Sequence, residues 1–237
     1  MVLSSREGAR GQSPQQFEVA VIRPNPAGAS AGTNFDLFEG GRLRIINEPV
    51  KLMIRVAFQI QNSQIAGGPG WVGSDRYDIE AKTGRPEKIE PGQLSPLMQG
   101  LLSERFHLRV HRETRDLAVY ALVAAKSGPK LKPKAEGEGS AMNTKGGPGR
   151  SQLTGTGVSM KLLAGYVGNR LGRIVLDKTG LSDSYDFTLD WAPEQAPDSS
   201  VPSLVTALQE QLGLRIESAR SPVEVLVIDS IDRPSEN

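Results

Sequence analysis

Residues 96–125, PLMQGLLSERFHLRVHRETRDLAVYALVAA, and residues 202–231, PSLVTALQEQLGLRIESARSPVEVLVIDSI, follow one pattern at an offset of 106 positions. Proline opens both stretches, and apolar positions coincide along them without a gap. The matched pairs are Pro96 with Pro202, Leu102 with Leu208, Glu104 with Glu210, Phe106 with Leu212, Leu108 with Leu214, Arg109 with Arg215, Val110 with Ile216 and Val119 with Val225. A pattern repeated over this length predicts two copies of one structural unit.

Each copy begins as a helix and continues as strands. Met98 and Leu102 have the spacing of an amphipathic helix with proline in its first turn. From Phe106 onward, apolar and polar residues alternate as in a half-buried strand, and the alternation resumes at 117–121 after a turn predicted at 113–116. The second copy repeats this order, with its turn at 221–222, so a hairpin is predicted to end each copy.

The similarity extends upstream. An apolar helical run from Lys51 leads to SDRYDI at 74–79, and a run from Lys161 leads to SDSYDF at 182–187. Each copy is therefore predicted as strand, helix, strand, helix and hairpin, and the expected fold class is α+β. An additional strand at 17–22, closed by prolines, has no counterpart and is expected at a sheet edge.

Composition divides the chain into a tail, two modules and a linker. Residues 1–16 are polar and are predicted to be a disordered tail. Residues 127–150 are dense in Gly, Pro and Lys and hold almost no large apolar side chain, which is typical of a flexible linker. We expect a first α+β module at 17–126 and a second at 151–237.

Charge and cysteine content exclude several classes of protein. Among 237 residues, 28 Lys and Arg balance 27 Asp and Glu, so no overall field attracts nucleic acid or an anionic membrane. The absence of cysteine excludes disulfides, thiolate zinc sites, iron–sulfur clusters and cysteine nucleophiles. We expect no cofactor, no specific nucleic-acid partner and no membrane span, and the N-terminal segment lacks the apolar core of a secretory signal.

A predicted strand carries the most distinct surface signal. One face of it presents Arg105, His107, Arg109 and His111. Residues 101–134 hold eight Lys or Arg against three acids, whereas residues 177–237 hold four against twelve. This polarity indicates a polyanion site, docking of complementary surfaces, or an ordinary solvated face. Because histidines four apart on a strand are separated by about 13 Å, no metal site is expected.

Three carboxylates suggest an alternative based on general acid–base chemistry. They belong to Asp183, Asp186 and Asp190. The last two share one face of a predicted strand, so an exposed strand face explains them more simply. The motif DKTG from Asp177 is interpreted as a turn, because Asp, Thr and Gly are turn formers.

Other catalytic motifs are not supported. The Gly-rich segments at 67–70 and 146–149 lack the Gly-Lys-Ser/Thr ending of a phosphate-binding loop. No Gly-x-Ser-x-Gly elbow occurs, and both histidines lie on one predicted strand, which makes a hydrolase triad improbable. The sequence therefore names no catalytic residue.

Five segments together carry a resemblance. They are FEVA from Phe17, IAGGPGWVGSDRYDIEAK from Ile65, LLSERFHLRVHRETRDLAVYALV from Leu101, VLDKTGLSDSYDFTLDW from Val175 and the ending from Pro202. Over residues 17–237 the chain resembles the soil-associated protein family, a domain of unknown function expanded in certain soil bacteria. Some relatives carry the domain behind a membrane metallopeptidase of the beta-lactam-sensor type. The resemblance implies a periplasmic or extracellular location but no activity, cofactor or catalytic residue.

We therefore expect a non-enzymatic exported protein that binds another protein or an envelope component. Its candidate binding residues are Arg105, His107, Arg109 and His111. The alternative is a hydrolase that acts on an envelope polymer with the carboxylates near Asp183, Asp186 and Asp190.

Overall fold

The computed structural model describes residues 16–29, 31–134, 139–147, 149–193 and 201–235. It contains both helices and strands, which confirms the α+β class. Except for Gln16, the tail predicted at 1–16 lies outside the described residues.

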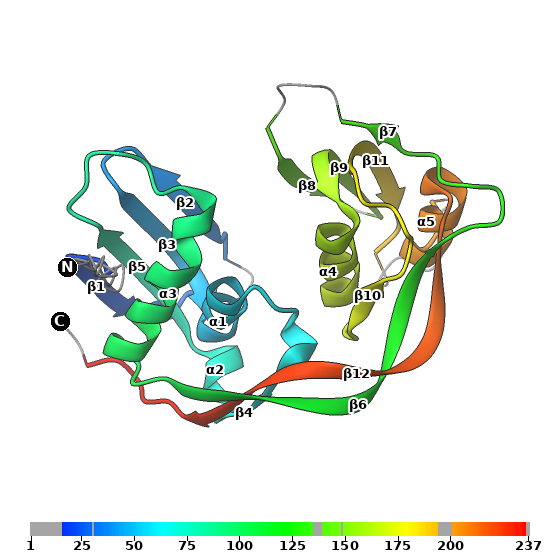
Figure 1. Cartoon of the computed structure of the whole chain (residues 1–237). Helices are drawn as coiled ribbons and strands as arrows, with labels where there is room; N and C mark the ends of the chain where they lie inside the picture. The colour runs from blue at the N-terminus through cyan, green and yellow to red at the C-terminus, as the bar shows by residue number, and fades with distance from the viewer. Residues whose placement is uncertain (1–15, 30, 135–138, 148, 194–200, 236–237) are drawn as a thin grey trace, which may run out of the picture. The chain divides into compact units, whose positions relative to one another are not determined.

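Contacts divide the chain into two compact units (Figure 1). Unit 1 comprises the described residues up to Ile60, Ile65–Glu113, and the described residues from Val225 onward. Unit 2 comprises Gln61–Gln64, a short 3-10 helix with its preceding residue, and the described residues of Thr114–Glu224. Unit 2 is therefore largely an insertion within unit 1 along the chain.

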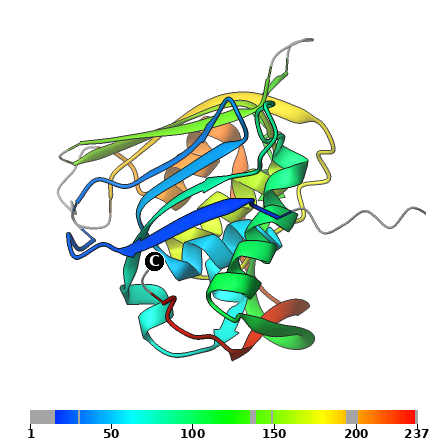
Figure 2. The same cartoon turned by 90° about the vertical axis from the view of Figure 1, so that its left-hand side faces the viewer.

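Unit 1 is an antiparallel sheet with two helices on one face (Figures 1 and 2). Its strand order is β1-β5-β3-β2. Ile22, Ile45 and Ile79 of the sheet pack with Met53 and Leu102 of the helices into one core. The elements are β1 (Val19–Pro24), β2 (Asn34–Phe38), β3 (Arg42–Pro49), α1 (Val50–Phe58), β4 (Ile65–Gly67), α2 (Trp71–Ser74), β5 (Arg76–Lys82), α3 (Pro91–Arg105) and the start of β6 (Arg109–Ala124).

Unit 2 has the same kind of architecture. Its strand order is β7-β11-β9-β8. Leu153 and Leu189 of the sheet pack with Leu163 and Leu208 of two helices. The elements are β7 (Lys132–Pro133), β8 (Ala141–Gly147), β9 (Arg150–Ser159), α4 (Met160–Leu171), β10 (Val175–Asp177), β11 (Ser184–Trp191), α5 (Leu204–Leu212) and most of β12 (Leu214–Ser230). Ser159 and Ser203 cap the two helices, each accepting a backbone N–H through its hydroxyl.

Two long strands carry the chain between the units. β6 enters unit 2 at Thr114, and β12 enters unit 1 at Val225. They belong to a third sheet with strand order β10-β6-β12-β4. The short strands of this sheet pair in parallel, Val175 of β10 opposite Tyr120 of β6, and Ile65 of β4 opposite Leu226 of β12.

The hairpins predicted at the end of each copy are wrong. Residues 113–116 and 221–222 are extended, so β6 and β12 are single strands. The sequence ETRD at 113–116 has no Gly or Asn to adopt the left-handed conformation of a tight hairpin turn. Arg105 was predicted on the strand but ends α3, and β6 begins only at Arg109.

Part of the segment predicted as a linker forms strands in unit 2. β7 and β8 both lie within residues 127–150. β8 is an edge strand held by backbone pairing with β9, so it forms without an apolar face of its own. Residues 135–138 and 148 of the segment lie outside the described residues.

The sheet β1-β5-β3-β2 and the sheet β7-β11-β9-β8 each contain a β-bulge stabilised by an aspartate. The Asp78 carboxylate accepts the Asn47 backbone N–H at 2.8 Å, and the Asp186 carboxylate accepts the Gly157 N–H at 2.7 Å. Asn47 and Gly157 have φ angles of 54° and 56°, and pairing shifts register beside them. Asp186 is therefore a structural residue that fixes the path of the neighbouring strand.

Candidate functional site

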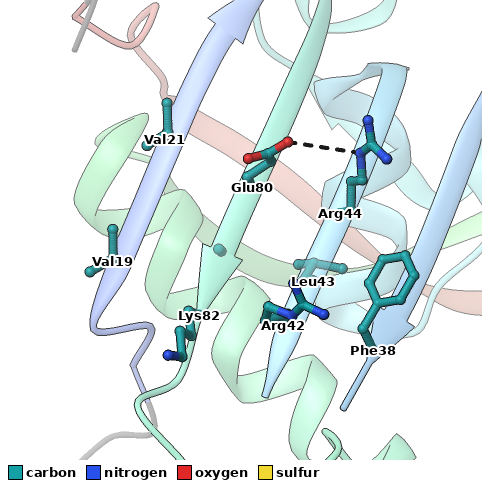
Figure 3. A pocket seen from close by; sticks show the side chains of 9 residues that line it. Val19, Val21, Phe38, Arg42, Leu43, Arg44, Glu80 and Lys82 are labelled. Carbon is teal, nitrogen blue, oxygen red and sulfur yellow. Dashed lines mark ion pairs between the residues drawn. The ribbon is translucent and has the colours of Figure 1, made fainter. Parts of the chain in front are cut away.

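The helix-free face of the unit 1 sheet contains a hollow of about 540 Å³ (Figure 3). Because side chains alternate along strands, the residues between the core positions of β1, β5 and β3 point to this face. The hollow is lined by Val19, Val21, Phe38, Arg42, Leu43, Arg44, Glu80, Ala81 and Lys82. It crosses all four strands of the sheet.

One cross-strand row within the hollow has an unusual composition. Strand register places Val19 opposite Lys82, Lys82 opposite Arg42, and Arg42 opposite Phe38. We call these four residues the cationic row. Val19 is 55% exposed and Phe38 is 38% exposed, and the Arg42 guanidinium lies 5.6 Å from the centroid of the Phe38 ring. The row is thus two adjacent cations between two exposed apolar side chains.

The charges of the cationic row are not neutralised within it. Among the described residues, neither Lys82 nor Arg42 has an ion-pair partner, and Arg42 donates only to the Glu39 carbonyl at 3.3 Å. Like charges directly opposite one another on neighbouring strands are unfavourable. In the next row, by contrast, Arg44 lies opposite Glu80 at 3.8 Å. The cationic row therefore favours an anion.

A second hollow of about 210 Å³ adjoins the first. The two share Val21, Arg44 and Glu80, and the second adds Arg23 and Asp78 among its lining residues. The two hollows together provide an extended polar and apolar surface across the four strands.

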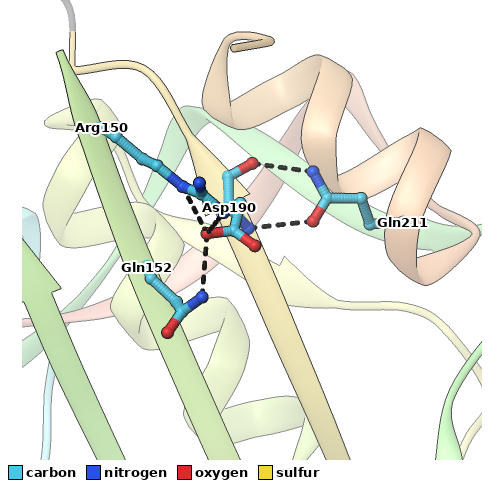
Figure 4. A network of polar contacts seen from close by, with 4 residues as sticks. All are labelled: Arg150, Gln152, Asp190 and Gln211. Atoms are coloured by element: carbon cyan, nitrogen blue, oxygen red, sulfur yellow. Dashed lines mark hydrogen bonds and ion pairs between the residues drawn. The ribbon is translucent and has the colours of Figure 1, made fainter.

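On the corresponding face of unit 2, the carboxylate at the position that matches Lys82 is paired with its neighbours (Figure 4). Asp190 of β11 accepts hydrogen bonds from Arg150 at 2.9 and 3.0 Å and from Gln152 at 3.0 Å. The Gln211 amide of α5 bonds both the N–H and the carbonyl of Asp190, at 2.9 and 2.7 Å. The carboxylate of Asp190 thus belongs to a structural network.

Burial shifts the titration of a polar cluster in unit 1. It raises the pKa of Glu48 above its ordinary value, although a hydrogen bond from Thr33 and the charges of Arg76 and Arg55 oppose the shift. It also lowers the pKa of Arg55. Burial is the largest cause in both, so it disfavours the charged form of each side chain, while the attraction between Glu48 and Arg55 acts in the opposite direction.

Family comparison covers most of the chain. Residues 51–231 match a family described as a protein of unknown function, DUF3738. The chain belongs to the DUF3738 family. The family match includes Glu80 and Lys82 of the hollow, whereas Val19, Phe38 and Arg42 precede it. No curated protein and no solved structure matches the chain.

In this DUF3738 chain, the residues predicted for binding lie in unit 1 but are not all on one strand. Arg105 ends α3, where its guanidinium lies 3.6 Å from the Glu104 carboxylate. His107 precedes β6 with a φ of 48°, and Arg109 and His111 follow on the strand. Phe106 and Leu108 are buried, as the alternation predicts.

Both histidines have carboxylate partners. Nδ1 of His107 lies 3.2 Å from the Asp232 carboxylate, and Nδ1 of His111 lies 2.7 Å from the Asp229 carboxylate. These aspartates come from the end of β12 and the residues after it. They offset part of the positive charge that the sequence alone assigned to this surface.

The predicted carboxylates have local structural contacts. Asp186 and Asp190 bind Gly157 and Arg150 respectively, as described above, and Asp183 is exposed. Asp177 accepts the N–H and the hydroxyl of Thr179, which confirms the turn interpretation of DKTG. No group of three or more His, Asp or Glu side chains within the described ranges is arranged to hold a metal ion.

Sequence reasoning missed the cationic row. Its four residues come from four strands, so only strand register brings them together. The alternation of arginine and apolar residues at 42–45 is a local signal for one of these strands. In the part of this DUF3738 chain that the structure describes, no helix has the length and apolar content needed to cross a membrane.

Proposed function

We propose that the protein acts by binding rather than by catalysis, and that its partner is a protein segment presenting a carboxylate between apolar side chains. The cationic row carries this proposal, because Lys82 and Arg42 are register partners on neighbouring strands and neither has an ion-pair partner among the described residues. A carboxylate placed over the row would relieve their repulsion. Val19 and Phe38 would bury exposed apolar surface in the same contact.

The shape of the surface favours a protein segment over a small molecule. Small-molecule sites are usually enclosed and bury most of their ligand. Here the larger hollow lies on an open sheet face, and the smaller one extends it past Arg44 and Arg23. An extended segment of acidic and apolar residues fits both hollows at once.

We also propose that the chain contains two copies of one module, at 17–126 and 151–237, with residues 127–150 between them. Apart from the 3-10 helix at Asn62–Gln64 and α2, the element order β3-α1-β4-β5-α3-β6 recurs as β9-α4-β10-β11-α5-β12, and β7 and β8 lie within residues 127–150. Two sheets with matching strand orders and an aspartate-held bulge in each support this proposal. The copies would then differ chiefly in their side chains.

The resemblance to the soil-associated family supports export to the periplasm or cell surface. The partner would there be another protein of the envelope or a protein attached to it. Exposed cations on a binding face increase the rate of encounter with an acidic partner, and salt reduces this effect.

A second basic surface is a weaker binding candidate. It comprises Arg105, His107, Arg109 and His111, and the pairing of both histidines with aspartates lowers its net charge. For the hydrolase alternative, the contacts of Asp186 and Asp190 with Gly157 and Arg150 already account for these carboxylates structurally. These contacts support binding over hydrolysis.

A labelled peptide of alternating glutamate and leucine tests the proposal. Fluorescence anisotropy should show that it binds the protein, and that raising the salt concentration weakens binding because exposed charges are screened. The double variant Lys82→Asp with Arg42→Gln should weaken binding by about tenfold or more, since both cations of the row are removed.

Two controls make this result specific. Lys145→Asp changes an exposed lysine on β8 of unit 2 and should leave the affinity unchanged. A peptide of alternating lysine and leucine should bind much more weakly. Equal binding of both peptides, or unchanged binding by the double variant, contradicts the proposal.

A further inference from the structure

The last strand of the chain completes the core of unit 1. Leu226, Ile228 and Ile231 are buried in the same core as α1 and α3. Leu226 and Ile228 lie in the part of β12 that pairs in parallel with Ile65–Gly67 of β4. Unit 1 therefore depends on residues that follow unit 2 in the sequence.

Two glycines allow this strand to approach closely. A Cβ atom at Gly68 would lie 2.9 Å from Cδ1 of Ile228, and one at Gly67 would lie 3.1 Å from the Ile228 carbonyl oxygen. Both glycines have positive φ angles, of 70° for Gly67 and 76° for Gly68. The Gly-rich segment at 67–70 thus shapes a slot for an incoming strand.

Unit 2 depends in the same way on a strand that begins in unit 1. Leu122 of β6 is fully buried in the unit 2 core, with Tyr120 packed against it. The Tyr120 N–H donates to the Ile174 carbonyl at 2.8 Å, and the Lys178 N–H donates to the Leu122 carbonyl at 2.9 Å. β10 therefore receives β6 as β4 receives β12.

The two pairings occur at matching positions of the repeat. Tyr120 and Leu226 are separated by the same 106 positions as the matched stretches of the sequence. Each is paired with the first residue of a short strand, Val175 or Ile65. Such reciprocal donation of a terminal strand is the arrangement of a strand-exchanged dimer.

We propose that this chain is a strand-exchanged pair of modules, in which residues 225–231 occupy a strand-accepting slot beside β4. The slot also accepts the same segment from a second copy of the chain. The specificity comes from parallel backbone pairing together with burial of Leu226 and Ile228. This inference does not depend on the cationic row.

A donor-strand experiment on the full chain tests the slot. The variant Ile228→Asp places a charge in the unit 1 core and should release the chain's own strand from the slot. A fluorescein-labelled peptide with the sequence of residues 222–232, PVEVLVIDSID, should then bind the variant about tenfold or more tightly than the wild type, whose slot is filled. The control Ser230→Asp, at an exposed position of β12, should behave as the wild type.

The milder variant Ile228→Ala serves if the aspartate variant does not fold, and it should bind the peptide with intermediate affinity. A peptide with aspartate in place of its isoleucine at position 228 should not bind either chain. Equal peptide binding by variant and wild type overturns the proposed slot. The same variant should bind the glutamate–leucine peptide with the affinity of the wild type. If only the affinity for the 222–232 peptide changes, the slot is tested independently of the proposed function.

Exchange between copies is measured by light scattering after partial unfolding and refolding. The dimer fraction should rise with protein concentration during refolding, because donation in trans then competes with donation within one chain. A chain that refolds only to monomer at all concentrations contradicts exchange with a second copy.

Discussion

The open faces of the two sheets differ in how their central charges are neutralised. On β5 and β3 of unit 1, Lys82 faces Arg42. On β11 and β9 of unit 2, Asp190 faces Gln152, which donates to it at 3.0 Å. Among the described residues the first pair has no counterion, whereas in the second pair the Asp190 carboxylate is bonded by Gln152 and Arg150. The backbone thus determines which residues are opposite one another, and the identity of two residues determines whether their charges are paired within the unit.

Substitutions at the two β-bulges should have the largest effect on the free energy of unfolding. The bulges maintain the strand register on which the open faces of both sheets depend. Asp78→Ala leaves the Asn47 N–H and the Asn25 amide without their acceptor and should lower the free energy of unfolding by roughly 2–3 kcal/mol. Asp186→Ala loses only the Gly157 N–H contact and should cost roughly 1–2 kcal/mol. Urea denaturation measures both, and the exposed Asp183→Ala is the control. Equal losses in all three variants exclude a specific role for the bulges.

Removing one charge should change the free energy of unfolding more at the Asp190–Gln152 pair than at the Lys82–Arg42 pair. Asp190→Ala should lower the free energy of unfolding by about 1–2 kcal/mol, since Arg150, Gln152 and their partly buried network lose an acceptor. Lys82→Ala should change it by less than about 0.5 kcal/mol, because no partner is lost. Thermal unfolding of the two variants side by side checks the difference. A larger loss of stability for Lys82→Ala than for Asp190→Ala contradicts the assignment of the paired charge to unit 2.

Giving unit 1 an internal counterion should make its face resemble that of unit 2. Lys82→Asp places a carboxylate opposite Arg42 and should raise the free energy of unfolding by about 0.2–1 kcal/mol, while binding of the glutamate–leucine peptide falls. The gain should diminish in 1 M salt, where the screening length is about 3 Å. A gain that persists at high salt indicates a cause other than charge.

The smallest expected effect is the pH dependence at Glu48, which lies at the end of β3. Its pKa is raised in the folded protein, so its stabilising contribution is present below the ordinary value of 4.5 and is lost as the pH rises through the folded value. Glu48→Gln should therefore be more stable than the wild type at pH 7, by less than about 1 kcal/mol because the group is partly exposed. The free energies of unfolding of Glu48→Gln and the wild type should converge below pH 4.5. A variant less stable than the wild type at neutral pH contradicts the direction of the shift.

The sequence predicted the helices and the alternation of strands because both are local periodicities. Helical spacing at Met98 and Leu102 corresponds to α3, and Phe106 and Leu108 face the core as expected. The prediction failed at residues 113–116, because alternation does not determine whether a strand continues or turns back. It also failed to find the cationic row, since register across β1, β5, β3 and β2 is a property of tertiary structure.

The late position of β12 reverses the usual sequence of events during synthesis. Domains generally fold from the N-terminus as the ribosome produces them. Here every described residue of unit 2 precedes Val225, so unit 2 is complete before the ribosome has added Leu226 and Ile228. The unit that is begun first is finished second, and its core remains open to other strands throughout translation of the residues between.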